Sequence, residues 1–517
     1  MKKTIALLFL CFVGIKSLNG MQGNPSLQSN LKTLKTSLVT LKSKLGDLNN
    51  KLGGLKAKIV GKGTGYEQAL GIEKEKPAPE IVAKREDYGT KPRNEFFTNI
   101  MGVDEKSGET NMFMTNSDQI IKGLEVGPDP SKTKLFKING VDGKGKHVVY
   151  QCGFFEKIKL GDLQKKASTE QTKDFGPIIF NVIEADKNVF WEDDNGKSSD
   201  GVDIGALQAD PENKNAVFQV ASNFNALETL GHTDKIPNIT KYVGDKTQGP
   251  SASISAAPGL IYRHYYYFYD GKKENALNWQ QKPQHNPTVS NFQINLLKDL
   301  GIKTMNGYIW GDGNEPDRSK DSGIKSIVGT NANKFCIGYH SEVQVTFGGK
   351  RKKDEKGAQL DCQEFFYDPS QIIDQIFTAA LVAPETIFQR SDLLEGATND
   401  KVQLILNWIY EATLKAAFVK GKRNSSGKIK VFLTRMGGGA FGNPQNFIDN
   451  AIINAIQDPV LKQSGLIVTL NNYYSLDNNE AKDLLVHVNG QYIRYKADGA
   501  YKLTLDGDTV IETKIAK

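Results

Sequence analysis

A chain of 517 residues with 38% hydrophobic and 24% charged residues is typical of a globular protein with two or three domains, or one large domain with insertions. Its formal net charge of +7 is unevenly placed. Residues 1–20 carry +3 and residues 26–62 carry +7, which leaves −3 for everything else. A slightly acidic body excludes electrostatic steering as the source of attraction for an anionic ligand, and we expect no nucleic-acid partner.

The cysteine and histidine residues exclude the common disulfide and metal frameworks. Without the first 20 residues, Cys152, Cys336 and Cys362 remain, and an odd number of this size allows at most one disulfide. The sequence contains no CxxC spacing and no HExxH motif. We expect neither a metal site nor a cofactor.

The first 20 residues have the layout of a signal peptide. Lys2 and Lys3 precede an apolar run at 5–15, and small or polar residues follow it. The bulky Leu10 disfavours a lipoprotein cleavage before Cys11. No later stretch reaches the roughly 18 apolar residues that a membrane span needs. The sequence therefore predicts a protein that is exported to the periplasm or secreted, with no stable membrane span.

Residues 26–60 repeat apolar side chains with the spacing of a coiled-coil helix. The intervals alternate between four and three residues at Leu27, Leu31, Leu34, Leu38, Leu41, Leu45, Leu48, Leu52, Leu55 and Ile59. Lysines line both edges of this seam and would repel a parallel copy of the segment. We expect a coiled-coil partner that is either a second copy of the chain or an acidic protein or surface. Residues 61–79 read as a linker.

The stretch 80–177 contains short strand-like runs, such as 147–151, between many turn signals. It offers no residues with recognisable chemistry. We interpret it as an N-terminal accessory subdomain that covers a site formed later in the chain.

A buried strand at 216–221 leads into the first loop with candidate chemistry. Asn223 and Asn225 follow the strand and are suited to hydrogen-bond sugar hydroxyls, although asparagines at a strand end also form Asx turns and helix caps. A helix is predicted at 251–257, and its start at Thr247, Gln248 and Gly249 is a candidate ligand-binding segment because backbone amides there point toward an anion.

Three acids accompany this loop. Asp245, just before the predicted helix, is a candidate general base or water-orienting carboxylate, and Asp234 and Glu228 are weaker candidates. A loop cap or a solvated surface acid is the structural alternative for each of them.

The second loop follows a predicted buried strand at 431–434 and precedes a predicted helix at 445–456. Glycine lets a backbone approach phosphate closely and adopt positive φ, so this strand, glycine loop and helix start predict an anion site. Its candidate ligand-binding residues are Gly437, Gly438, Gly439, Ala440, Phe441, Gly442 and Asn443.

Strands alternate with helices through the second half of the chain. Residues 372–382 and 466–470 read as buried strands, 293–300 and 402–418 as helices, and 492–515 as a small β-meander. The pattern predicts an α/β sheet, in which ligands bind beyond the carboxyl ends of the strands, where both loops would lie.

Four blocks in this order resemble the macrodomain superfamily: VFQVASNFNALE, DKTQGPSASISAA, IIDQIFTAALV and VFLTRMGGGAFGNPQNFIDNAI. The similarity is closest to the poly(ADP-ribose) glycohydrolase-like and bacterial effector-type ADP-ribosylhydrolases. It spans 178–475 and implies a three-layer α/β/α mixed sheet that binds ADP-ribose, with 476–517 as a C-terminal β extension. Poly(ADP-ribose) glycohydrolases follow a triple-glycine loop with paired glutamates, whereas Ala440 and Phe441 stand here and Gln363-Glu364 occurs elsewhere. This departure favours a hydrolase of mono-ADP-ribose.

The resemblance and the residues together imply an ADP-ribosylhydrolase. Asp245, assisted by Asp234 or Glu228, would activate a water that attacks the anomeric carbon of the distal ribose. A binding module for ADP-ribose or an ADP-ribosylated protein would share every loop residue and lack the chemistry. A third alternative is an interaction protein in which the coiled coil is the active part and the body is inactive.

Overall fold

A computed structural model describes residues 84–105, 136–171, 173–185, 202–228, 239–245, 247–266, 294–302, 304–309, 327–349, 361–383, 398–472, 475–496 and 498–515. The chain separates into two units, Met1–Ile81 and Val82–Lys517, and every described residue belongs to the second. The predicted signal peptide (1–20), coiled-coil helix (26–60) and linker (61–79) lie outside the described residues, as does Asp234, so these remain predictions.

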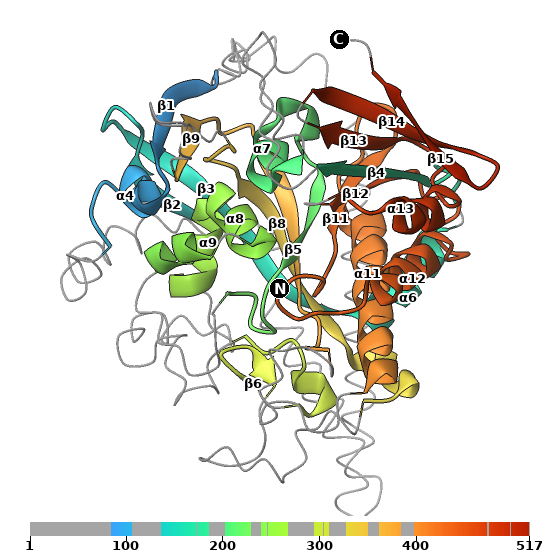
Figure 1. Cartoon of the computed structure of the whole chain (residues 1–517). Coiled ribbons are helices and arrows are strands. Elements are labelled where there is room, and N and C mark those ends of the chain that lie inside the picture. The colour runs from blue at the N-terminus through green and yellow to red at the C-terminus, as the bar shows by residue number, and fades with distance from the viewer. Residues whose placement is uncertain are drawn as a thin grey trace, which may run out of the picture. The chain divides into compact units, whose positions relative to one another are not determined.

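One mixed sheet of 11 strands organises the described part of the chain (Figure 1). Its order is β15 (Thr509–Lys514), β14 (Gly499–Asp506), β13 (Tyr492–Lys496), β4 (Ile179–Ala185), β12 (Leu466–Asn472), β11 (Ile429–Thr434), β5 (Val217–Ala221), β10 (Ile372–Thr378), β8 (Cys336–Gln344), β3 (His147–Lys159) and β2 (Phe136–Val141). Neighbouring strands from β13 to β10 pair parallel, and the strands outside them pair antiparallel. The carboxyl ends of the parallel strands therefore meet along one edge of the sheet, which is called the carboxyl edge below.

Helices cover both faces of this sheet (Figure 1). On one face lie α6 (Leu160–Glu170), α11 (Asn399–Lys420) and α12 (Gln445–Ile456), and on the other lie α4 (Phe96–Met101), α7 (Ile204–Ala209), α8 (Gln248–Ser255) and α9 (Ala257–Ile261). Side chains on neighbouring strands identify the two faces. Gln219 on β5 donates to Thr413 of α11, whereas Gln375 on β10 donates to the carbonyl of Ala252 in α8. The predicted α/β class with a mixed sheet and helices on both faces is confirmed.

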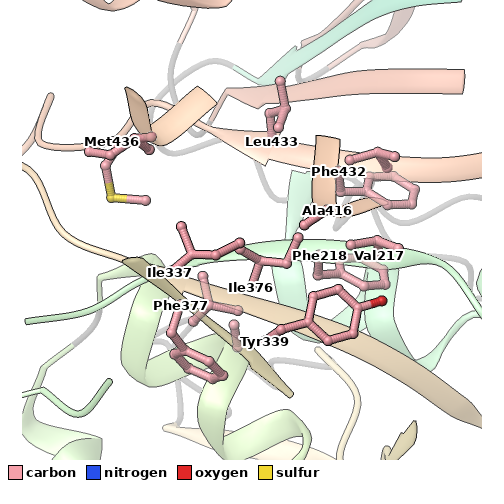
Figure 2. Close-up of a cluster of buried hydrophobic side chains, with 14 of the residues drawn as sticks. Val217, Phe218, Ile337, Tyr339, Ile376, Phe377, Ala416, Phe432, Leu433 and Met436 are labelled. Atoms are coloured by element: carbon pink, nitrogen blue, oxygen red, sulfur yellow. The ribbon is translucent and has the colours of Figure 1, made fainter. Parts of the chain in front are cut away.

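The core lies where β5, β8, β10 and β11 meet the helices. Figure 2 shows one part of it, formed by Val217, Phe218, Ile337, Tyr339, Ile376, Phe377, Ala416, Phe432, Leu433 and Met436. The rings of Phe218 and Phe432 stack with centroids 4.6 Å apart, a pairing that contributes about 0.5–1.5 kcal/mol beyond its buried area. The same two residues are register partners in the parallel pair β5–β11. Burial of both faces thus fixes the register that brings the ends of these two strands together.

Smaller elements complete the described unit. The strands β1 (Glu86–Pro92) and β9 (Cys362–Tyr367) form a separate antiparallel pair, and α13 (Asn478–Leu485) packs against β14 and β15. Strands from the predicted segments 80–177 and 476–517 join the same sheet as those of 178–475. Within the described ranges, no helix is both long enough and apolar enough to cross a membrane.

Local predictions succeed where the hydrophobic period is long. The helix predicted at 445–456 is α12, with the same two ends. The strand predicted at 372–382 ends earlier, at Thr378, because the chain beyond it turns toward the glycine loop, where Leu381 and Ala383 form hydrogen bonds. The helix predicted at 293–300 is wrong: within its described residues only Lys298–Leu300 forms a single 3-10 turn.

Candidate functional site

The glycine loop leaves the sheet directly after β11. Its backbone has φ of +74° at Gly437 and +61° at Gly442. The backbone N–H of Asn443 donates to the Gly437 carbonyl, with N and O 2.9 Å apart. The side-chain amide of Asn443 donates to the same carbonyl at 3.1 Å and to that of Leu381 at 2.9 Å. Asn443 thus closes the loop and ties it to the chain beyond β10. Gly439, Ala440 and Gly442 stay exposed on the open side.

The first helix start is held against the end of β5 by one side chain. The Gln248 side-chain oxygen accepts from Ala221 N at 2.8 Å, and its nitrogen donates to Gln219 O at 2.8 Å. Gly249 lies so close that a Cβ there would overlap the Ala221 carbonyl and the Glu228 carboxylate. The Gln248 side chain is therefore an anchor for α8, and its predicted role in ligand binding can come only from the backbone at the start of the helix.

Two of the three predicted acids come together beside this helix start. The Tyr242 hydroxyl accepts from Glu228 N at 2.7 Å, and the Asp245 carboxylate accepts from Thr247 N at 2.8 Å. Burial raises the pKa of Glu228 well above its ordinary value, and the negative charge of Asp245 raises it further. Glu228 therefore retains a proton to higher pH than an ordinary glutamate. Asp245 is partly buried, and Thr247 is exposed next to it.

The two predicted sugar-binding asparagines are buried, with exposed fractions of 3% for Asn223 and 1% for Asn225. The Asn225 side-chain oxygen accepts from Leu227 N at 3.1 Å, which is an Asx turn, the structural alternative considered from the sequence. A hairpin of β6 (Thr304–Met305) and β7 (Tyr308–Ile309) lies over them, with Gly307 in contact with both. The structure thus places both asparagines under this hairpin, and their role toward a sugar remains a prediction.

The two loops lie side by side at the carboxyl edge. Their strands are parallel neighbours, and Thr434 N at the end of β11 donates to the Gln219 side chain on β5 at 3.1 Å. On the solvent side, the ring centroids of Tyr308 and Phe441 are 6.3 Å apart, so the hairpin over the first loop reaches the glycine loop. Gln248 and Gly438 therefore belong to the same edge of the molecule, as the prediction of a shared anion site requires.

Among the described residues, several of the buried side-chain polar atoms that lack a hydrogen-bond partner lie at this edge. They are Nε and Nη2 of Arg435, the side-chain oxygens of Asn443 and Asn471, and both amide atoms of Asn472. Arg435 does bind through Nη1, 2.8 Å from the side chains of both Gln445 and Asp449 in α12. Buried polar groups in native proteins are nearly always satisfied, so these atoms are candidates to bind water or a ligand at this edge.

Sequence reasoning missed Arg435, Asn471 and Asn472. The signal that identified Asn223, an amide at the end of a buried strand, was equally present at Asn471 and Asn472. Arg435 lacked such a signal because a charged residue before a glycine loop is ordinarily solvated, whereas here α12 covers it.

Gln363 and Glu364 do not belong to this site. They lie on β9, and Glu364 O accepts from Gly348 N at 2.9 Å. The neighbouring Phe347 N binds Ser255 O at 3.1 Å, at the carboxyl end of α8, whereas the candidate site is at its amino end. Among the described residues, no group of His, Cys, Asp and Glu side chains is arranged to hold a metal ion.

Comparison with known proteins gives only distant structural similarity. No family model matches the chain, and no curated protein does. The chain is similar to poly(ADP-ribose) glycohydrolase from Deinococcus radiodurans in complex with ADP-ribose, at 11% identity and a TM-score of 0.30, over 62% of this chain and 89% of that one. For poly(ADP-ribose) glycohydrolase from Thermomonospora curvata the values are 10% and 0.28, over 68% and 91%. At this distance a function has to be argued from the chain's own residues.

Proposed function

We propose that this protein is an ADP-ribosylhydrolase that removes mono-ADP-ribose from a protein side chain. One observation carries the proposal: two anion-type loops end on the same sheet edge, and a pair of carboxylates, Glu228 and Asp245, adjoins one of them. A diphosphate needs donors from two directions, and glycosidic hydrolysis needs an acid and a base beside the anomeric carbon.

In this proposal the diphosphate lies between the open side of the glycine loop and the start of α8. Backbone amides supply the attraction, since the body of the chain is slightly acidic. The buried Arg435 adds positive charge at the base of the loop, and its unpartnered Nε and Nη2 support an anion there. Asn223 and Asn225 are the proposed contacts of the distal ribose, and the hairpin that covers them would close that end of the site.

The two carboxylates take different roles because their surroundings differ. Asp245 removes a proton from water as the water oxygen bonds to the anomeric carbon of the distal ribose. Glu228, whose raised pKa keeps a proton on it, donates that proton to the departing side-chain atom as the glycosidic bond breaks. Water thus provides the new hydroxyl on ADP-ribose. Asp234 is the alternative to Glu228 as the residue that assists Asp245.

Asp245→Asn tests this assignment cleanly, because the asparagine oxygen can still accept from Thr247 N. General base catalysis contributes about 10²–10⁴-fold, so we expect the variant to release ADP-ribose from a mono-ADP-ribosylated protein at least about 100 times more slowly than the wild type. Its affinity for ADP-ribose should stay within about threefold. Asp210→Asn is the matched control: Asp210 accepts from Glu212 N at 2.9 Å in the same kind of turn, before β5, at the other end of that strand.

Each outcome has a clear meaning. Full turnover by Asp245→Asn would remove Asp245 from the mechanism. If the wild-type chain binds ADP-ribose but releases none from an ADP-ribosylated protein, it is a binding module. If it does not bind ADP-ribose at all, the proposal is refuted, and the interaction protein whose active part is the coiled coil is the remaining alternative.

Export through residues 1–20 and association through residues 26–60 are further parts of this proposal. A secreted enzyme of this kind would meet ADP-ribosylated proteins outside the cytoplasm that made it. The lysine-edged heptads would bring it to a second copy of the chain or to an acidic partner.

A further inference from the structure

The carboxylate of Glu105 is buried, with 4% of the residue exposed, far in sequence from both loops. One of its oxygens accepts from Ile239 N at 2.7 Å, and the other accepts from Thr240 N at 2.8 Å and from the Thr240 hydroxyl. These are the first donors of the 3-10 helix η4 (Ile239–Gly244), which have no partner inside the helix. Glu105 is thus the cap of η4, supplied from a segment 134 residues earlier.

The helix η4 sets the position of both proposed catalytic carboxylates. It carries Tyr242, whose hydroxyl accepts from the backbone nitrogen of Glu228 at 2.7 Å. It also leads directly into Asp245, whose own backbone nitrogen donates to the Tyr242 carbonyl at 3.1 Å. A shift of η4 would therefore move Asp245 with its backbone and release the amide of Glu228.

The same early segment also supports the other side of the Asp245 turn. Arg93, in the short 3-10 helix η1 (Arg93–Glu95), has 7% exposure and donates from Nη2 to the Ser251 hydroxyl of α8 at 3.0 Å. Asp245 lies between η4 and α8, so the segment 93–105 contacts the elements on both sides of it.

We propose that Glu105 is a positioning residue for the hydrolysis. It holds η4 so that Asp245 faces the anomeric carbon beside Glu228. The inference rests on the proposed function, and it gives the early segment, where the sequence showed no chemistry, a direct part in forming the catalytic pair.

Glu105→Gln is the informative variant, because glutamine keeps one acceptor oxygen and replaces the other with an NH2 group, which cannot accept from a backbone N–H. One of the two backbone hydrogen bonds to η4 is therefore lost. We expect kcat to fall by about 10–100-fold while KM stays within about threefold, since the glycine loop is untouched. The alkaline limb of the kcat profile should move to lower pH. Glu228 must be protonated to act as the acid, and its pKa falls when Asp245 moves away and water enters.

Asp203→Asn is the matched control. Asp203 caps α7 in the same way, accepting from Gly205 N at 2.8 Å and Ala206 N at 3.0 Å, but α7 carries none of the proposed catalytic residues. This variant should lower stability without moving the pH limb or kcat. If Glu105→Gln does not fold, Thr240→Val, which removes only the hydroxyl bond to Glu105, should change kcat and the pH limb in the same direction by a smaller amount.

Wild-type kcat and an unmoved pH limb in Glu105→Gln, or in Thr240→Val where Glu105→Gln does not fold, would overturn the positioning role and leave the proposed function standing. If the wild-type chain releases no ADP-ribose, the proposed function fails. Amide hydrogen exchange then tests separately whether Glu105 holds η4 in place. Faster exchange at 239–245 in Glu105→Gln than in Asp203→Asn supports the positioning of η4, and equal exchange refutes it.

Discussion

Two glycines in the same loop offer a matched pair of substitutions with different expected effects on stability. At Gly437 the backbone φ is +74°, and an added Cβ would lie 2.7 Å from the Cβ of Ala380 and overlap the side-chain amide of Asn443. At Gly439 nothing lies within 4 Å of an added Cβ. Both variants add one methyl group, so any difference between them comes from the position and not from the size of the change.

The structure sets the magnitude for Gly437→Ala. A left-handed conformation costs an L-residue about 1–2 kcal/mol, and forcing packed neighbours apart costs about 1–3 kcal/mol, so the closed loop should lose about 2–5 kcal/mol. The displaced neighbour is the amide of Asn443, which closes the loop through two carbonyls. The substitution should therefore open the loop as well as destabilise the chain.

Urea unfolding and calorimetric titration with ADP-ribose measure both effects. Gly437→Ala should lower the unfolding midpoint and weaken ADP-ribose binding by at least about tenfold, which corresponds to about 1.4 kcal/mol. Gly439→Ala should unfold like the wild type but bind ADP-ribose more weakly, because its methyl group stands on the open side of the loop where phosphate would approach. Wild-type affinity in Gly437→Ala would refute the reasoning, since the closed loop would then not be the form that binds.

Two further predictions concern the frame around the site. Gln248→Ala should lower the free energy of unfolding by about 2–4 kcal/mol in urea, because Ala221 N and Gln219 O lose their partner at the end of β5. A loss no larger than that of Gln164→Ala, which removes one bond near the surface, would contradict the anchor role. Asp374 is buried on β10, accepts from the Tyr339 hydroxyl at 2.6 Å and has a pKa raised by burial from 3.8 to about 6. The folded state therefore retains its proton better than the unfolded state does, and the stability that this residue contributes is lost as pH rises from about 4 through about 6. The stability of the wild type relative to Asp374→Asn should fall by roughly 2–3 kcal/mol over that range, and a pH-independent difference would refute the assignment.

Elements with a strong local pattern could be predicted from the sequence. The helix at 445–456 has apolar residues at helical spacing, and Pro444 precedes it, so both its ends were correct. The glycine loop was recognisable because φ near +74° at Gly437 is a demand that glycine meets best. The α/β sheet could be inferred because strands alternate with helices through the second half.

Contacts between distant segments could not be predicted in this way. Glu105 caps η4, and no local sequence pattern in either segment predicts this contact between residues 134 positions apart. The side chain of Gln248 turned out to bind backbone, because only the fold reveals that the end of β5 needs a donor and an acceptor at that point. The failed helix at 293–300 has a related cause: Leu296 N bonds to Phe224 O, so the long-range contact prevailed over local helical propensity.

A crystal structure of the chain with ADP-ribose tests the central claim most directly. Both phosphates should lie within hydrogen-bonding distance of backbone amides, one in the glycine loop between Gly438 and Gly442 and the other at the start of α8 near Gln248. The anomeric carbon of the distal ribose should face Asp245 and Glu228. ADP-ribose bound away from the carboxyl edge, or held by only one of the two loops with its distal ribose remote from both acids, would contradict the account.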